Sequence, residues 1–169
     1  MTGVLRSAIG ALAMLTIPLS PARAASIPIS LTIPPFVQIS GLSDVIFASV
    51  SLSADATRAQ NVCIYSNSVT RAYTVTATGS GSGSSFRLSG LGGATAPYSV
   101  SWSGTSGSSG GSALSAGSPS GVFSNAGTTP ACAGGTSSTL TVHIRASDLQ
   151  AMTGGVSYTG ALTLLIAAA

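Results

Sequence analysis

Alternation of apolar and polar residues is the feature that most restricts what this chain can fold into. In residues 73–78 and 140–145 every second residue is apolar, and Thr, Val and Tyr are frequent. Successive side chains of a β-strand point to opposite faces, so this pattern predicts strands with one buried face. No stretch keeps an apolar period of 3.6 residues over enough positions to predict a helix of several turns. One helical turn is expected at residues 147–150, where Ser147 is placed to cap it.

Other short strands are expected between Gly- and Ser-rich turns. They lie at residues 27–33, 36–39, 45–47, 62–65, 86–88, 98–102 and 158–166. About eight short strands joined by polar turns predict an all-β sandwich.

The N-terminus predicts export. Arg6 precedes an apolar run at residues 8–19, and a small-residue cleavage pattern follows at residues 22–24. The run is too short to cross about 30 Å of hydrocarbon, so no integral membrane span is expected. We expect residues 1–24 to be a signal peptide that is removed, leaving one exported domain.

Charge is scarce after residue 24. That part of the chain has no Lys or Glu, and four Arg oppose three Asp, for a net charge of +1. Scattered arginines form no stripe that binds phosphates, so nucleic acid is not expected as a partner. A surface with so little charge lacks self-repulsion, which favours self-association.

Two cysteines, Cys63 and Cys132, lie 69 positions apart. In an exported chain such a pair predicts a disulfide rather than a metal or redox site. Closing a loop of that length stabilises a fold by roughly 4 kcal/mol on the chain-entropy model.

Residues with catalytic potential are few. His143 is the single histidine, and the strand register points it toward solvent. Residues 107–111 match the G-x-S-x-G pattern inside a Gly/Ser tract, without the strand and helix that a nucleophile elbow needs. One His and three Asp do not build a zinc site of ordinary spacing. We expect no enzyme activity, no cofactor and no metal, while a Ser-His-Asp triad assembled from distant segments stays open.

Residues 103–121 differ from the rest of the chain. Fourteen of these 19 residues are Gly or Ser, so the segment has almost nothing to bury. It is interpreted as a long flexible surface loop, with a binding or assembly loop as the alternative.

Several segments together resemble the spore coat protein U-like subunits of archaic chaperone–usher pili. The similar segments are residues 62–67, 73–79, the P-Y-x-V-x-W pattern at 97–102, the Asp148-Leu149 pair and the Y-x-G-x-L-T-L pattern at 158–164. With Cys63 and Cys132 they cover most of the chain after the signal peptide.

The resemblance implies an immunoglobulin-like sandwich, residues 36–169, that lacks its last strand. A periplasmic chaperone would fill the open groove, and an outer-membrane usher would exchange it for the N-terminal strand of the next subunit. Ile27, Ile29, Leu31 and Ile33 supply the apolar alternation of such a donor strand within residues 25–35. We expect no closing strand after residue 166. The implied function is a structural pilus subunit at the cell surface, in adhesion or biofilm formation.

Three alternatives remain open: a domain that is complete by itself, a monomeric adhesin, and a hydrolase. Residues 27–33 are equally compatible with the domain's own first strand, which would complete the sandwich. The protein would then be a terminal or accessory subunit, or a monomeric secreted adhesin that binds through Tyr98, Trp102 and residues 103–121. A hydrolase that depends on His143 is the third alternative.

Overall fold

The computed structural model describes residues 27–133 and 135–169. The expected signal peptide, residues 1–24, lies outside the described residues. The chain divides into a short N-terminal unit that ends at Thr32 and a body, Ile33–Ala169. Residues 27–32 belong to no helix or strand.

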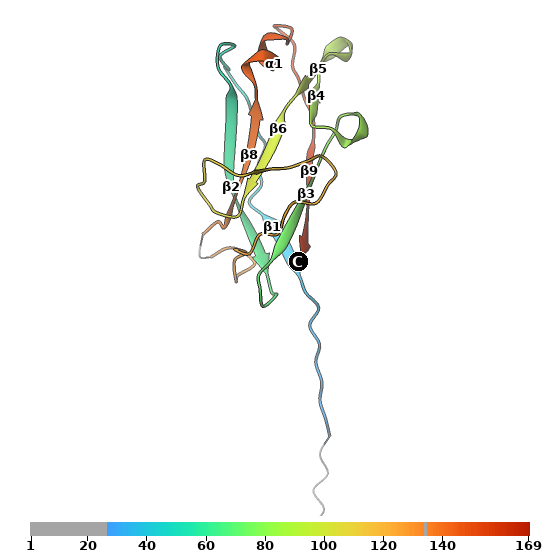
Figure 1. Cartoon of the computed structure of the whole chain (residues 1–169), viewed down its shortest axis with the longest axis vertical. Coiled ribbons are helices and arrows are strands. Elements are labelled where there is room, and N and C mark those ends of the chain that lie inside the picture. The colour runs from blue at the N-terminus through green and yellow to red at the C-terminus, as the bar shows by residue number, and fades with distance from the viewer. Residues whose placement is uncertain (1–26, 134) are drawn as a thin grey trace, which may run out of the picture. The chain divides into compact units, whose positions relative to one another are not determined.

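The body contains two sheets and a hairpin, all antiparallel (Figure 1). The first sheet has the order β1-β2-β8-β6-β7, the second pairs β3 with β9, and β4 and β5 form the hairpin. The strands are β1 (Val37–Ser40), β2 (Ala56–Ser66), β3 (Tyr73–Gly79), β4 (Arg87–Ser89), β5 (Thr95–Pro97), β6 (Ser99–Ser103), β7 (Ser112–Ala113), β8 (Ser138–Ile144) and β9 (Leu162–Ala168). The helices are the short 3₁₀ turns η1 (Ser82–Ser84) and η2 (Leu91–Gly93) and one α-helical turn, α1 (Ala146–Gln150).

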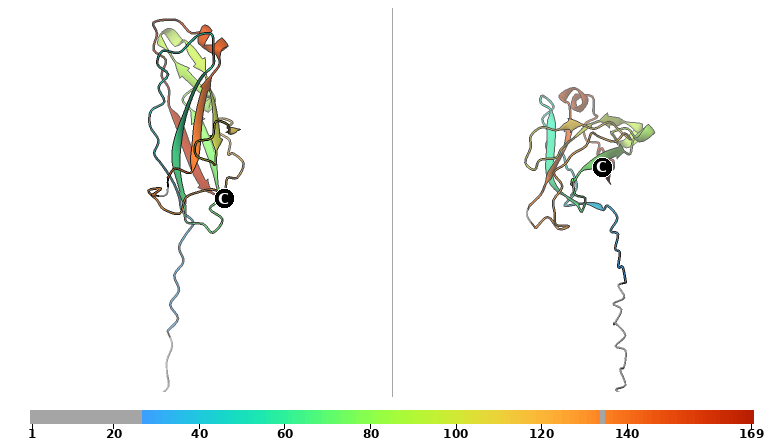
Figure 2. Two further views of the ribbon diagram at one scale, coloured as in Figure 1. Left: turned by 90° about the vertical axis from the view of Figure 1, so that its left-hand side faces the viewer. Right: turned by 60° about the horizontal axis from the view of Figure 1, so that its bottom comes forward.

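Apolar faces of the two sheets enclose one main core, as the two layers in Figure 2 show. The buried residues alternate along the strands, as the sequence predicts, and include Val62, Ile64, Tyr73, Val75, Ala77, Val100, Trp102 and Leu140. The indole N–H of Trp102 donates to the Tyr73 hydroxyl at 3.2 Å, and that hydroxyl lies 2.8 Å from the Ser138 hydroxyl. The predicted all-β sandwich is confirmed.

The disulfide prediction is also confirmed, because Cys63 in β2 is bonded to Cys132. Their Cα atoms lie 5.8 Å apart, a usual distance for a disulfide. The bond fixes the segment that precedes β8 to the C-terminal part of β2.

Several local predictions within the sandwich differ from the structure. Residues 45–47 form no strand, whereas β2 begins at Ala56, six residues before the predicted strand. The helical turn begins at Ala146, and its first N–H is bound by the Asp55 carboxylate at 2.8 Å, with no capping bond from Ser147. Each difference comes from a contact with a distant segment, which local propensity does not contain.

The Gly/Ser segment is bound to the sandwich more closely than its composition predicts. β7 pairs with β6, and Leu114 is only 7% exposed. The segment then reaches the edge of β3, where the N–H groups of Gly117 and Ser120 donate to the carbonyls of Ala77 and Val75. In Figure 1 this yellow segment crosses from the first sheet to the second. It is therefore a hydrogen-bonded crossover rather than a free surface loop.

Candidate functional site: an open apolar groove

Strand β9 uses only one of its two edges. It pairs with β3 from Leu162 opposite Gly79 to Ala168 opposite Tyr73. Leu162, Leu164 and Ile166 point toward the core, because they alternate with the exposed Thr163 and Leu165. Among the described residues, no strand pairs with the second edge of β9. Unpaired N–H and C=O groups on a strand edge are ready to bind another strand.

Residues 42–50, which we name the lip segment, lie opposite β9. β1 pairs with the last four residues of β2, 63–66, and Gly41 at φ 81° then turns the chain out of the ladder. Glycine adopts this left-handed conformation without steric cost. The lip segment forms no strand and, among the described residues, makes no backbone–backbone hydrogen bond. Its apolar side chains Val45, Phe47 and Val50 are half-buried.

An open groove of about 970 Å³ separates the lip segment from the stretch 156–164 that leads into β9. Core residues of β8 and α1 form its floor, namely Leu140, Val142, Ile144 and Leu149. Leu88, Tyr98, Met152 and Val156 line its upper end, whereas Leu162 and Leu164 form the β9 wall. The floor residues are buried, and the half-exposed apolar side chains of the groove are on its two walls.

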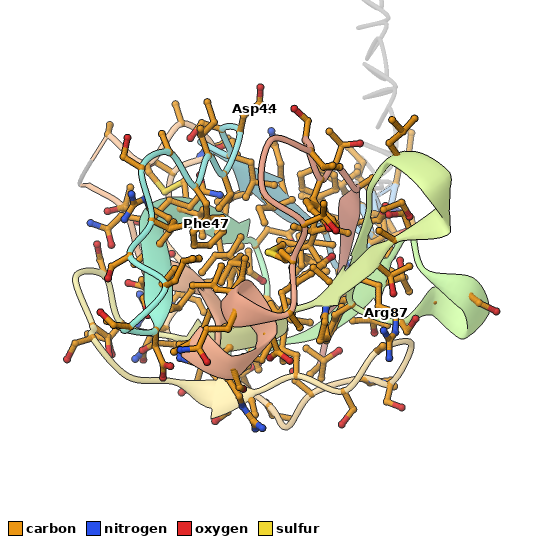
Figure 3. All side chains as sticks on the ribbon, turned by 90° about the horizontal axis from the view of Figure 1, so that it is seen from above. Asp44, Phe47 and Arg87 are labelled. Atoms are coloured by element: carbon orange, nitrogen blue, oxygen red, sulfur yellow. A yellow bond between two sulfur atoms is a disulfide. The ribbon has the colours of Figure 1, made fainter. Side chains whose placement is uncertain are left out.

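Charge is nearly absent from this groove. Asp44 is the one charged residue among those that line it, and it is exposed on the lip segment, where Figure 3 labels it near Phe47. Burial raises the pKa of the Tyr98 phenol, so this side chain is neutral at any physiological pH. An apolar, uncharged groove beside an unpaired strand edge is suited to an extended segment with apolar side chains at alternate positions.

The four predicted assembly residues are exposed. Ile27, Ile29, Leu31 and Ile33 are 70–94% accessible, and residues 27–36 belong to no strand. The structure therefore does not show residues 27–33 as the domain's own first strand. Among the described residues, the apolar face of this segment is not buried against any other part of the chain.

His143 belongs to a polar row on the outer face of the first sheet. Its Nε2 atom lies 3.0 Å from the Asp55 carboxylate, and its Nδ1 atom lies 3.3 Å from the Ser99 hydroxyl. Hydrogen bonds, first from the Ala146 N–H and then from His143, lower the pKa of Asp55. The structure thus brings a Ser, a His and an Asp together, but none of them lines the groove. The row joins β6 and β8 to the residue before β2 and to the first turn of α1, which is a structural role.

Trp102 does not support binding through an exposed aromatic surface. It is fully buried in the core, and Tyr98 packs against Phe86 with ring centres 5.6 Å apart. The aromatic residues that the adhesin alternative needs are therefore largely occupied by packing.

The lip segment was not recognised in the sequence. Residues 45–47 resemble a strand, and only the side chains of β2 reveal why they do not pair.

Among residues 27–133 and 135–169, no group of three or more His, Cys, Asp or Glu is placed to hold a metal ion. Within the same residues, no helix is long and apolar enough to span a membrane.

Searches with protein-family models and among curated proteins found no match to this chain.

Proposed function

We propose that this protein is a structural subunit of a chaperone–usher surface pilus that assembles by strand exchange between copies. One observation carries the proposal: the unpaired edge of β9 borders an apolar groove whose floor is the sandwich core. Half-exposed apolar side chains such as Leu162 and Leu164 and unpaired backbone groups are costly in water, so a partner strand that covers both gains free energy twice. An added strand supplies ladder hydrogen bonds, and its alternate side chains fill the groove.

The proposed occupant is the N-terminal segment of a second copy of this chain. Ile27, Ile29, Leu31 and Ile33 share one face of an extended segment, and Ser30 and Thr32 share the other. All four apolar side chains are exposed, and this exposure does not stabilise an isolated monomer. Pro28 is compatible with this role only at a position where its missing N–H faces away from the ladder.

A periplasmic chaperone and an outer-membrane usher are the partners that this proposal requires before assembly. The chaperone would cover the groove of the new subunit, since an exposed strand edge is an aggregation site. The subunit would pass through the periplasm and remain at the cell surface, with adhesion or biofilm formation as its role. The proposed function is structural, without catalysis.

The test uses a chain of residues 34–169, which keeps the groove, and a synthetic peptide of residues 25–35. We expect the peptide to bind, to raise the thermal unfolding temperature and to give a complex that resists mild detergent. Ile29→Asn and Leu31→Asn in the peptide should abolish binding, whereas the matched Ser30→Asn and Thr32→Asn should preserve it. The proposal would be refuted if the chain of residues 34–169 is a stable monomer that does not bind the peptide and the chain of residues 25–169 does not assemble.

A further inference from the structure

Two polar side chains of β2 occupy the face that elsewhere forms the core. Arg58 is paired with Val142 and Gln60 with Leu140, and both β8 partners are buried. Directly opposed residues of antiparallel strands lie on the same face of a sheet. Arg58 and Gln60 therefore lie on the core-side face of β2, between the buried Ala56 and Val62, and Gln60 lines the groove.

Both side chains bind the lip segment. The Gln60 side-chain oxygen accepts hydrogen bonds from the Ser43 N–H at 3.0 Å and the Ser43 hydroxyl at 2.9 Å. The Gln60 amide group donates to the Ser43 carbonyl at 3.2 Å. The Arg58 Nε–H donates to the Ile46 carbonyl at 3.2 Å, and the guanidinium lies 5.7 Å from the centre of the Phe47 ring.

These contacts replace the backbone ladder that would otherwise join the lip segment to β2. Paired strands lie about 4.8 Å apart, whereas a side chain of the length of Gln or Arg spans a larger gap. The lip segment is thus held beside β2 without being a strand of its sheet. Apart from the Ser43 and Ile46 groups that these side chains bind, its backbone makes no backbone–backbone hydrogen bond among the described residues.

Without this tether, the lip segment would be expected to collapse into the groove. Val45, Phe47 and Val50 of the lip segment and Leu162 and Leu164 of the opposite wall are half-buried apolar side chains. Closing the groove would bury apolar surface, which stabilises the closed state by about 25 cal/mol per Å². Arg58 and Gln60 oppose the collapse, because it would bury a charge and an amide without their present partners.

We infer that Arg58 and Gln60 are positioning residues that hold the lip segment beside β2, away from β9, and keep the groove wide enough for an incoming strand. The inference rests on the proposed function, because it names the incoming strand as the segment of residues 25–35 from another copy. It goes further in assigning the open state of the groove to two polar side chains of β2.

The experiment compares the mature chain, residues 25–169, with the double variant Arg58→Met and Gln60→Leu. Thr57→Leu, on the opposite face of the same strand, is the matched control. The labelled peptide of residues 25–35 is added in excess, and its association rate is followed by fluorescence anisotropy. The thermal unfolding temperature is measured without peptide.

We expect the double variant to unfold at a higher temperature than the wild type and to take up the peptide at least about tenfold more slowly. A merely structural role predicts the opposite change in stability, with lower unfolding temperature. Gln60→Asn, which keeps the amide but shortens its reach, should give an intermediate rate; it also keeps the test valid if the double variant does not fold.

Equal association rates in the wild type, the double variant and Gln60→Asn would overturn the inference while leaving the proposed function intact. A wild-type chain that takes up no peptide would instead refute the proposed function. The control Thr57→Leu should match the wild type in both measurements, and a slower rate there would show that any change on β2 disturbs uptake.

Discussion

The two sides of the sandwich treat their strand edges differently. On one side, the crossover that follows β6 covers both sheets: β7 pairs with β6, and residues 117–123 are hydrogen-bonded to β3. On the other side, β9 and the lip segment face each other across an open groove. One sheet pair is therefore closed by a Gly/Ser segment along one side and left unclosed along the other.

Composition alone does not explain the difference. The covering crossover is poor in apolar residues, and it satisfies the edge of β3 with backbone groups and the Ser120 hydroxyl. The lip segment is richer in apolar residues, yet it makes no such backbone bonds. Hydrogen-bonding geometry, rather than hydrophobicity, thus decides which side is closed. The predictions below test this comparison.

The disulfide should make the largest contribution, and it should stabilise the sandwich as a whole. Replacing both Cys63 and Cys132 with Ala should reduce the free energy of unfolding by about 4 kcal/mol, because the unfolded chain regains the freedom of a long loop. Urea unfolding of the isolated chain measures the loss, and the wild type under reducing conditions is the control. A loss below about 1 kcal/mol would show that the packing of the two sheets holds without the covalent link.

Leucines on the two sides should differ in their effect on stability. Leu114→Ala, on the buried part of the crossover, should cost about 3 kcal/mol. Leu164→Ala, on the half-exposed groove wall, should cost about half as much, because less surface leaves water when the isolated chain folds.

The same pair should separate stability from binding. Leu164→Ala should weaken binding of the peptide of residues 25–35, and Leu165→Ala, which changes the outer face of β9, should not. Equal stability losses for Leu114→Ala and Leu164→Ala would mean that the groove is already filled in the isolated chain.

A smaller effect is expected from Ser120→Ala. Its hydroxyl accepts the Val75 N–H at 2.9 Å, so the variant leaves a strand-edge donor without its partner and should cost about 1 kcal/mol. Ser118→Ala, exposed on the same segment, is the control and should be neutral. Hydrogen exchange of the Val75 amide should increase only in the first variant.

Asp55 should give a pH-dependent and smaller contribution. Its pKa is lowered below the usual 3.8, first by the Ala146 N–H and then by His143, so the folded state favours the carboxylate. This contribution is present above the unfolded pKa and is lost as the pH falls through the folded pKa. Asp55→Asn should therefore be less stable than the wild type near neutral pH.

In acid the two proteins should become equally stable, which thermal unfolding at several pH values will measure. A difference that persists with Asp55 protonated would show that the carboxylate charge is not the cause. Because Asp55 anchors α1, whose Leu149 lies in the groove floor, the variant also tests whether that floor depends on the helix.

Much of the fold could be predicted from local pattern. Alternation at residues 73–78 and 140–145 identified two core strands, since the period of a strand is a property of the backbone. The Cys63–Cys132 pair followed from the count and spacing of cysteines in a chain expected to be exported. The apolar alternation of Ile27, Ile29, Leu31 and Ile33 was equally readable.

The groove could not be predicted in the same way. Nothing local to residues 45–47 distinguishes a lip segment from a strand, because the difference lies in Arg58 and Gln60, more than ten positions away. The Gly/Ser crossover was likewise misread as a free loop, since its hydrogen bonds to β3 depend on backbone groups that carry no sequence signal.

The sequence by itself determined the main core strands, their buried faces and the disulfide, because periodicity and cysteine pairing are expressed in neighbouring or countable residues. Only the tertiary structure decided which side of the sandwich is closed. That choice depends on which backbone edges find partners across the fold, and such pairing is a property of distance in space rather than of order along the chain.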